Sequence, residues 1–173
     1  MKSFVKFGLG TGLLVSAWNL SCFTIVSWID KTLLLGIPVA RIRAYSGLFG
    51  IVLLIIGVYV GIREAKKKNE NQITFGEALR TGIFISLISA AIAGLFAFIY
   101  CTIINPGYAD YMVRDAESTL MASKKTSKEI SQELIQVRNR FSTTTQVLQA
   151  LIAQSVMGSI GSLIISLFIR SKK

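Results

Sequence analysis

The chain has 173 residues, 52% of them hydrophobic, and its mean hydropathy of +0.58 is typical of a membrane protein. Its 19 lysines and arginines outnumber 9 acidic residues, which in a membrane chain indicates contact with anionic lipid; no motif for nucleic acid is present. Histidine is absent and there are only two cysteines, so common metal ligands and the commonest general base are missing, and no cofactor or metal is expected.

Four apolar stretches are long enough to cross a bilayer as helices, for which about 20 residues suffice. They cover residues 4–29, 44–62, 81–104 and 146–169. The sequence therefore predicts an all-α fold: a single integral membrane domain over residues 1–173, built as a four-helix transmembrane bundle. The first apolar run exceeds the roughly 7–15 residues of a signal peptide, so a retained helix is favoured. The segment NLSC, which ends at Cys22, matches a lipidation motif poorly.

Basic residues indicate which ends of the spans face the cytoplasm. An even number of spans places both termini on one side of the membrane. Lysines and arginines crowd the helix ends at 63–68 and 170–173. Because basic residues close to span ends tend to stay inside, we expect both termini to be cytoplasmic.

Small residues recur at four-residue spacing in several spans and therefore share one helix face. Such faces let two helix backbones approach closely in a membrane. The pairs are Gly8 and Gly12, Gly57 and Gly61, and Gly158 and Ser162. The pattern indicates a helical bundle strongly and an oligomer only weakly.

The segment ITFGEALRTG, residues 73–82, places charges at the mouth of the third span. Thr74 and Glu77 form the T-x-x-E pattern of a capping box, in which each satisfies a backbone N–H at the helix start. Arg80 lies three residues further on, close enough to pair with Glu77. The favoured interpretation is structural, a helix start at the inner surface. The alternative is a functional pair that lines a cytoplasmic vestibule.

The centres of the four spans contain no charged residue. Ion-coupled transport and voltage sensing usually need an intramembrane charge, so this composition counts against both. The deepest polar side chains are Asn19 and Gln154. Each is expected to hydrogen-bond to a neighbouring helix and so to set its orientation.

Residues 105–145 form the outer connection between the third and fourth spans. A helix is expected over 108–122, and a second one from Ser127, because Thr126 and Glu129 form another capping box. The second helix carries a stripe of apolar residues at helical spacing, namely Ile130, Leu134, Val137 and Phe141. We expect an amphipathic helical hairpin in which this stripe packs on the first helix, near Tyr111, Met112 and Leu120. The alternative is a docking face for a partner protein.

The chain resembles a bacterial integral-membrane family catalogued as domain of unknown function 4199. The resemblance is carried by GIREAKKKNENQITFGEALRTGIFISLISA at 61–90, YCTIINPGYADYMV at 100–113 and GSIGSLIISLFIRSKK at 158–173. It implies a multi-pass protein of the bacterial inner, or cytoplasmic, membrane. It implies no activity and no catalytic residue.

The sequence favours a non-catalytic inner-membrane protein that packs with itself or with a larger membrane complex. A small uncoupled transporter or channel subunit that forms an oligomer is the main alternative, since uncharged spans do not exclude passive transport or an apolar cargo. A membrane enzyme is the least favoured class, because histidine, a buried carboxylate and a thiol pair are all missing. The expected partners are the lipid bilayer and, in the favoured class, copies of the chain or another membrane protein.

Overall fold

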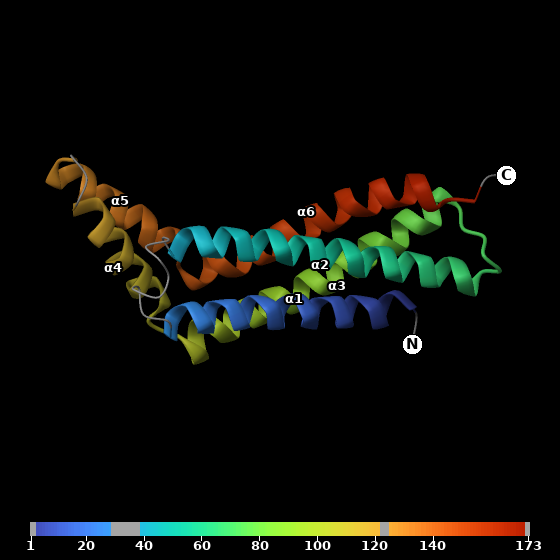
Figure 1. Cartoon of the computed structure of the whole chain (residues 1–173), viewed down its shortest axis with the longest axis horizontal. Helices are drawn as coiled ribbons and strands as arrows, with labels where there is room; N and C mark the ends of the chain where they lie inside the picture. The colour runs from blue at the N-terminus through green and yellow to red at the C-terminus, as the bar shows by residue number, and fades with distance from the viewer. Residues whose placement is uncertain (1–2, 29–38, 122–124, 172–173) are drawn as a thin grey trace. The chain divides into compact units, whose positions relative to one another are not determined.

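The computed structural model describes residues 3–28, 39–121 and 125–171, and the side chains of 23–28 and 39–44 are not described either. All regular structure in these ranges is helical (Figure 1). The helices are α1 (Ser3–Trp28), α2 (Val39–Lys68), α3 (Phe75–Ile99), α4 (Tyr108–Met121), α5 (Ser127–Arg140) and α6 (Thr143–Ile169). A short π-helix, η1 (Tyr100–Ile104), extends α3.

Three described helical segments are long and apolar enough to cross a membrane: Tyr45–Lys68, Phe75–Ile104 and Thr143–Ile169. They coincide with the second, third and fourth predicted spans, although the helices extend beyond the predicted ends. The predicted first span coincides with α1, whose last turns have side chains outside the described part of the chain. The protein is therefore a helical membrane protein, and passage of α1 through the bilayer stays a prediction.

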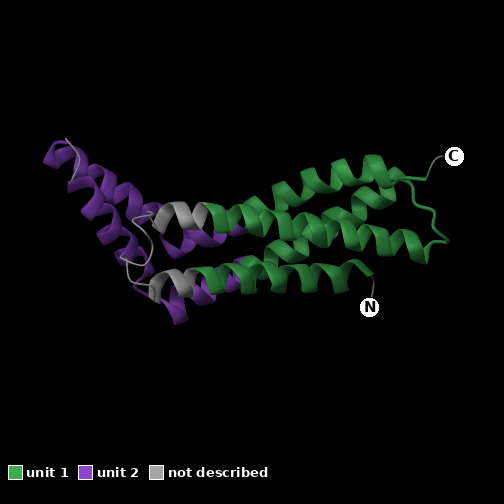
Figure 2. Ribbon diagram, viewed as in Figure 1, with its two compact units in different colours: residues 1–93, 151–173 green, residues 94–150 purple. Residues whose placement is uncertain are grey.

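The chain divides into two compact units, and the predicted single domain stays a prediction (Figure 2). Unit 1 contains residues 1–93 and 151–173, and unit 2 contains residues 94–150. The division falls inside α3 and inside α6, so each of these helices contributes to both units.

Unit 1 brings together α1, α2, the first part of α3 and the second part of α6 (Figure 2). Its core contains fully buried branched residues from α2 and α3, among them Leu54, Val58, Ile62 and Ile85. The start of α1, the turn between α2 and α3 and the end of α6 lie at the same end of this unit (Figure 1). Among the described residues, this end also holds hydrogen bonds that link distant segments, such as those from Lys66 to Ile169 and from Ile73 to Ser171.

The turn between α2 and α3 is short and closely held. Lys66, Lys67 and Lys68 occupy the last turn of α2, where cations stabilise the negative end of the helix dipole. Glu70 and Asn71 then adopt φ angles of 50° and 60°. Asparagine tolerates this left-handed conformation better than most residues do, which lets the chain reverse within a few residues.

Unit 2 contains α4 and α5, whose bounds agree with the two predicted outer helices. The Arg138 guanidinium on α5 pairs with the Asp110 carboxylate on α4 at 2.7 Å. The ring of Tyr108 contacts the ring of Phe141 edge-on, with centroids 6.0 Å apart. Tyr108 also contacts Tyr100 in η1, at 5.5 Å. The two helices are therefore in contact at the ends where Tyr108 and Phe141 lie.

Candidate functional site

The predicted capping box at the start of α3 is present. The backbone N–H of Thr74 donates to Glu77 Oε2 at 2.9 Å, and the backbone N–H of Glu77 donates to Thr74 Oγ1 at 3.3 Å. The Thr74 hydroxyl also donates to Glu77 Oε2 at 2.9 Å. These bonds satisfy two N–H groups that have no partner inside the helix. The Glu77 carboxylate therefore takes part in the capping box, and its functional role stays the alternative prediction.

The sequence suggested an ion pair between Glu77 and Arg80, and the structure does not form it. Among the described residues no ion pair joins them, although the spacing allows one. The Arg80 guanidinium instead lies over the ring of Phe84, 5.6 Å from its centroid. Phe84 stacks in turn on Phe4 of α1, with centroids 5.2 Å apart. An aromatic face attracts a cation at this distance, and Thr74 already occupies the Glu77 carboxylate.

Of the two deep polar residues, Gln154 makes the contact between helices that was expected. The hydroxyl of fully buried Ser89 on α3 donates to Gln154 Oε1 on α6 at 3.0 Å. Asn19 on α1 lies against α2 instead, with its amide nitrogen 3.6 Å from the position that a Cβ on Gly50 would occupy. Both residues therefore face a neighbouring helix, as a helix-orienting role requires.

The small residues singled out in the sequence lie at helix contacts in unit 1. A Cβ on Gly8 or Gly12 would meet Ile88 or Ile92 of α3 at 2.8 and 2.9 Å. The other positions are tighter still: Gly57 faces Thr11, Gly61 faces Ile85, Gly158 faces Ser86, and Ser162 faces Gly82. Because a real Cβ essentially never approaches that closely, these helix pairs depend on the absence of larger side chains.

The predicted apolar stripe of α5 is only partly exposed. Ile130, Leu134, Val137 and Phe141 are all half-buried. Ile135, which lies off the stripe, is 61% exposed. The stripe thus has partial cover, and the Phe141–Tyr108 contact identifies one residue of α4 that supplies it.

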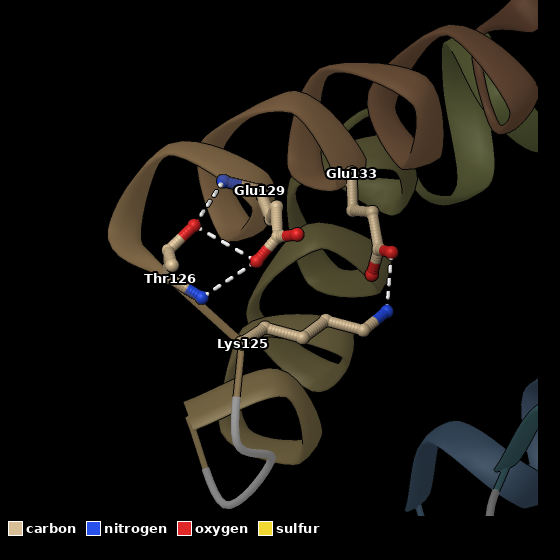
Figure 3. A network of polar contacts seen from close by, with 4 residues as sticks. All are labelled: Lys125, Thr126, Glu129 and Glu133. Carbon is tan, nitrogen blue, oxygen red and sulfur yellow. Dashed lines mark hydrogen bonds and ion pairs between the residues drawn. The ribbon is translucent and has the colours of Figure 1, made fainter.

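The start of α5 carries the second predicted capping box (Figure 3). The backbone N–H and the hydroxyl of Thr126 each donate to Glu129 Oε2 at 2.8 Å, and the Glu129 N–H donates to Thr126 Oγ1 at 3.4 Å. Lys125 pairs with Glu133 one turn further along. The backbone and hydroxyl bonds from Thr126, with a smaller contribution from the charge of Lys125, hold the pKa of Glu129 below its ordinary value.

One feature that sequence reasoning missed is a cation-lined cavity in unit 1. It has a volume of about 650 Å³ and lies where α2 and α6 end. Its lining residues are Tyr59, Val60, Arg63, Glu64, Lys66, Lys67, Asn71 and Ile169. The signal was available in the sequence, because Tyr59, Arg63, Lys66 and Lys67 recur at helical spacing on one face of α2. The lysines and arginine were counted only as markers of topology.

The buried polar side chains of the described residues are all hydroxyls: Thr11, Ser16, Ser46, Ser86, Ser89, Ser162 and Ser166. Within the same residues no group of three or more histidine, cysteine, aspartate or glutamate side chains is arranged to hold a metal ion. The described part of unit 1 thus offers hydrogen-bonding groups of low reactivity in its interior and charges only near helix ends.

These features define a helical membrane protein whose helices pack through small residues. The chain belongs to the family described as protein of unknown function (DUF4199), whose model matches residues 6–171. The resemblance drawn from the sequence is thereby confirmed. No curated protein and no solved structure matches the chain.

Proposed function

We propose that this protein is a non-catalytic component of the bacterial inner membrane, which acts by packing with itself or with other membrane proteins. The observation that carries the proposal is the interior of unit 1, where α3 and α6 meet through glycine and serine. Ser86 Oγ donates to Gly82 O at 2.8 Å, and Ser162 Oγ donates to Gly158 O at 2.6 Å. Each hydroxyl is satisfied within its own helix.

This contact of α3 and α6 through glycine and serine supports a packing role more than a transport role. Whereas the buried hydroxyls of Ser16 on α1 and Ser46 on α2 have no hydrogen-bond partner among the described residues, hydroxyls that bond to their own helix at the α3–α6 contact leave no line of unsatisfied polar groups for a permeating ion to use. Ser166 repeats the arrangement and donates to Ser162 O at 2.6 Å. Ser86, Ser162 and Ser166 are fully buried, so this part of the α3–α6 contact consists of closely packed backbone and small side chains.

The proposed topology has four spans, α1, α2, α3 with η1, and α6, with both termini in the cytoplasm. The start of α1, the α2–α3 turn and the end of α6 lie at one end of unit 1 (Figure 1), which supports an even number of spans. Two contacts hold the end of α6 there. The Lys66 ammonium donates to Ile169 O at 2.8 Å, and the Ser171 N–H donates to Ile73 O at 3.0 Å. The end of α6 therefore lies beside the α2–α3 turn, and the basic residues gathered there favour the cytoplasmic side.

We further propose that α4 and α5 form a helical hairpin on the periplasmic side. The contacts between Arg138 and Asp110 and between Phe141 and Tyr108 support this arrangement. The half-buried stripe supports it as well, because a docking face that waited for a partner would be more exposed.

The experiment that tests the proposal is purification of the tagged chain in mild detergent, followed by mass spectrometry and by reconstitution into proteoliposomes. A stoichiometric membrane partner, or a homo-oligomer that is impermeable to ions and small solutes, is the expected result. A homo-oligomer that conducts ions or passes solutes above the level of protein-free liposomes would contradict the proposal and support the transporter class.

A further inference from the structure

The cation-lined cavity at the end of α2 and α6 shares no residue with the glycine and serine contact of α3 and α6 described above. It combines a charged wall with an apolar wall. Arg63, Lys66 and Lys67 supply three cations, and Glu64 supplies one carboxylate. Glu64 is itself engaged by Lys68, at 3.8 Å. The charges that line the cavity are thus predominantly positive, which favours an anionic ligand.

The apolar wall lies one helical turn before the charged one. Tyr59 precedes Arg63 by four residues on α2, and Val60 precedes Glu64 by the same spacing. Tyr59 and Val60 are 44% and 42% exposed, and both belong to a segment long and apolar enough to cross a membrane. The cavity therefore passes from an apolar region on the span to a basic region at its end, within about two helical turns.

The charged end of the cavity is held in place by contacts between segments far apart in the sequence. The Lys66 ammonium bonds to Ile169 O, which fixes the end of α6 against α2. The Ile73 N–H donates to Ser171 Oγ at 3.1 Å, and Ser171 Oγ lies 3.4 Å from Asn71 O. Because Lys66 is used in this way, Arg63 and Lys67 are the cations best placed to receive a ligand.

We propose that this cavity binds the phosphate-bearing headgroup of an anionic phospholipid, with the first part of an acyl chain along Tyr59 and Val60. Basic pockets between helices at the cytoplasmic surface suit such headgroups. The guanidinium of Arg63 presents a planar pair of donors to a phosphate, and Lys67 adds a point charge. A volume of about 650 Å³ lies within the usual range of ligand sites, roughly 300–1,000 Å³. A free phosphate shares the headgroup chemistry but has no use for the apolar wall.

The test is native mass spectrometry of the purified full chain, titrated with phosphatidylglycerol or with zwitterionic phosphatidylcholine. The cavity variant is Arg63→Gln with Lys67→Gln. The control variant, Arg114→Gln with Lys128→Gln, removes the same two kinds of charge from exposed positions on α4 and α5. We expect wild type and control to prefer phosphatidylglycerol, and the cavity variant to bind it roughly tenfold more weakly. The charge-retaining variant Arg63→Lys with Lys67→Arg should keep most of the binding.

Equal binding of phosphatidylglycerol by the cavity and control variants would overturn the proposal, as would equal binding of the two lipids by wild type. Inorganic phosphate is used as a second ligand, to distinguish a lipid headgroup from a soluble phosphate compound. If inorganic phosphate binds wild type but not the cavity variant, while wild type and cavity variant bind phosphatidylglycerol equally, the site serves a soluble phosphate compound and the lipid assignment fails. If the double variant does not fold, Lys67→Gln alone, at an exposed position, should still weaken binding about threefold, and unchanged binding would again overturn the proposal.

Discussion

The α3–α6 contact of unit 1 and the α4–α5 contact of unit 2 both join two helices, but by different means. In unit 1, glycine and serine let the backbones meet; the hydroxyls of Ser86 and Ser162 bond within their own helices, and that of Ser89 bonds across the contact to Gln154. In unit 2, an exposed ion pair and the edge-on contact of buried Tyr108 with half-buried Phe141 join the helices, and we propose that the apolar stripe of α5 adds to them. Lipid supplies no hydrophobic force between helices, so close packing must hold the first contact, whereas burial of apolar surface can hold the second. The two contacts should therefore fail under different substitutions.

The largest expected effect is loss of the α4–α5 contact when its apolar stripe is made polar. Leu134→Ser with Val137→Ser removes two half-buried side chains. The variant should lose about 3 kcal/mol of local stability in total, since full burial of each side chain would contribute roughly 1.5–3 kcal/mol. Limited proteolysis of the purified variant should show faster cleavage within residues 105–142.

The matched control for that variant is Ile135→Ser with Met121→Ser, which changes two side chains that are 61% and 67% exposed. It should be cleaved at the wild-type rate. If the stripe variant is also cleaved at the wild-type rate, yet only wild type retains a copurifying protein, then the hairpin proposal is wrong and the stripe is a docking face.

The second effect concerns the small-residue contact. Gly158→Ala places a Cβ only 2.5 Å from Ser86 Cβ and should cost about 2 kcal/mol through overpacking. Ser86→Gly in the same chain removes the opposing side chain and should restore part of the loss. Thermal unfolding in detergent measures both variants.

Gly47→Ala is the control for the glycine substitution, because a Cβ at Gly47 meets nothing within 4 Å. It should leave the unfolding temperature unchanged or raise it slightly. A Gly158→Ala variant as stable as this control would show that α3 and α6 do not rely on close approach at this position.

The third effect compares the two capping boxes, which have nearly the same geometry. Thr74→Ala and Thr126→Ala should each cost about 1 kcal/mol at the start of their helices, measured by hydrogen exchange of the first turn. Glu77→Gln should cost less, because the amide oxygen still accepts from the Thr74 N–H. Loss of cellular function by Glu77→Gln in a normally folded protein would instead identify Glu77 as a functional carboxylate.

The smallest effect is a pH dependence at the start of α5. Folding lowers the pKa of Glu129, so its contribution is fully present above the unfolded-state pKa and is lost as the pH falls through the lower folded-state pKa. The hydrogen-exchange protection factors of the first turn of α5, which are corrected for the intrinsic pH dependence of exchange, should therefore fall as the medium is acidified through that range. Glu129→Gln should remove this dependence, and its persistence in the variant would assign the effect to another group.

The sequence was most informative where structure depends on residues close together in the chain. Both capping boxes lie within four residues, and their hydrogen bonds are those that the T-x-x-E pattern requires. Arg80 was misjudged because its partner, Phe84, competes with Glu77 at similar spacing, and the contact of Phe84 with Phe4 is not visible in a local pattern. The basic face of α2 that lines most of the cavity was visible in the sequence, but the contribution of α6 was not, since it depends on contacts such as Lys66 with Ile169.

The most direct test of the central claim, a four-span membrane protein with both termini in the cytoplasm, is cysteine labelling in cells. Single cysteines replace Lys2, Lys68, Ser131 or Ser171 in a chain that carries Cys22→Ala and Cys101→Ala, and a membrane-impermeant maleimide is applied before and after lysis. The account predicts labelling of position 131 in cells whose inner membrane is intact, and labelling of positions 2, 68 and 171 only after lysis. Labelling of position 2 together with position 131 before lysis would show that α1 does not cross the membrane. Labelling of position 131 only after lysis would contradict the proposed orientation.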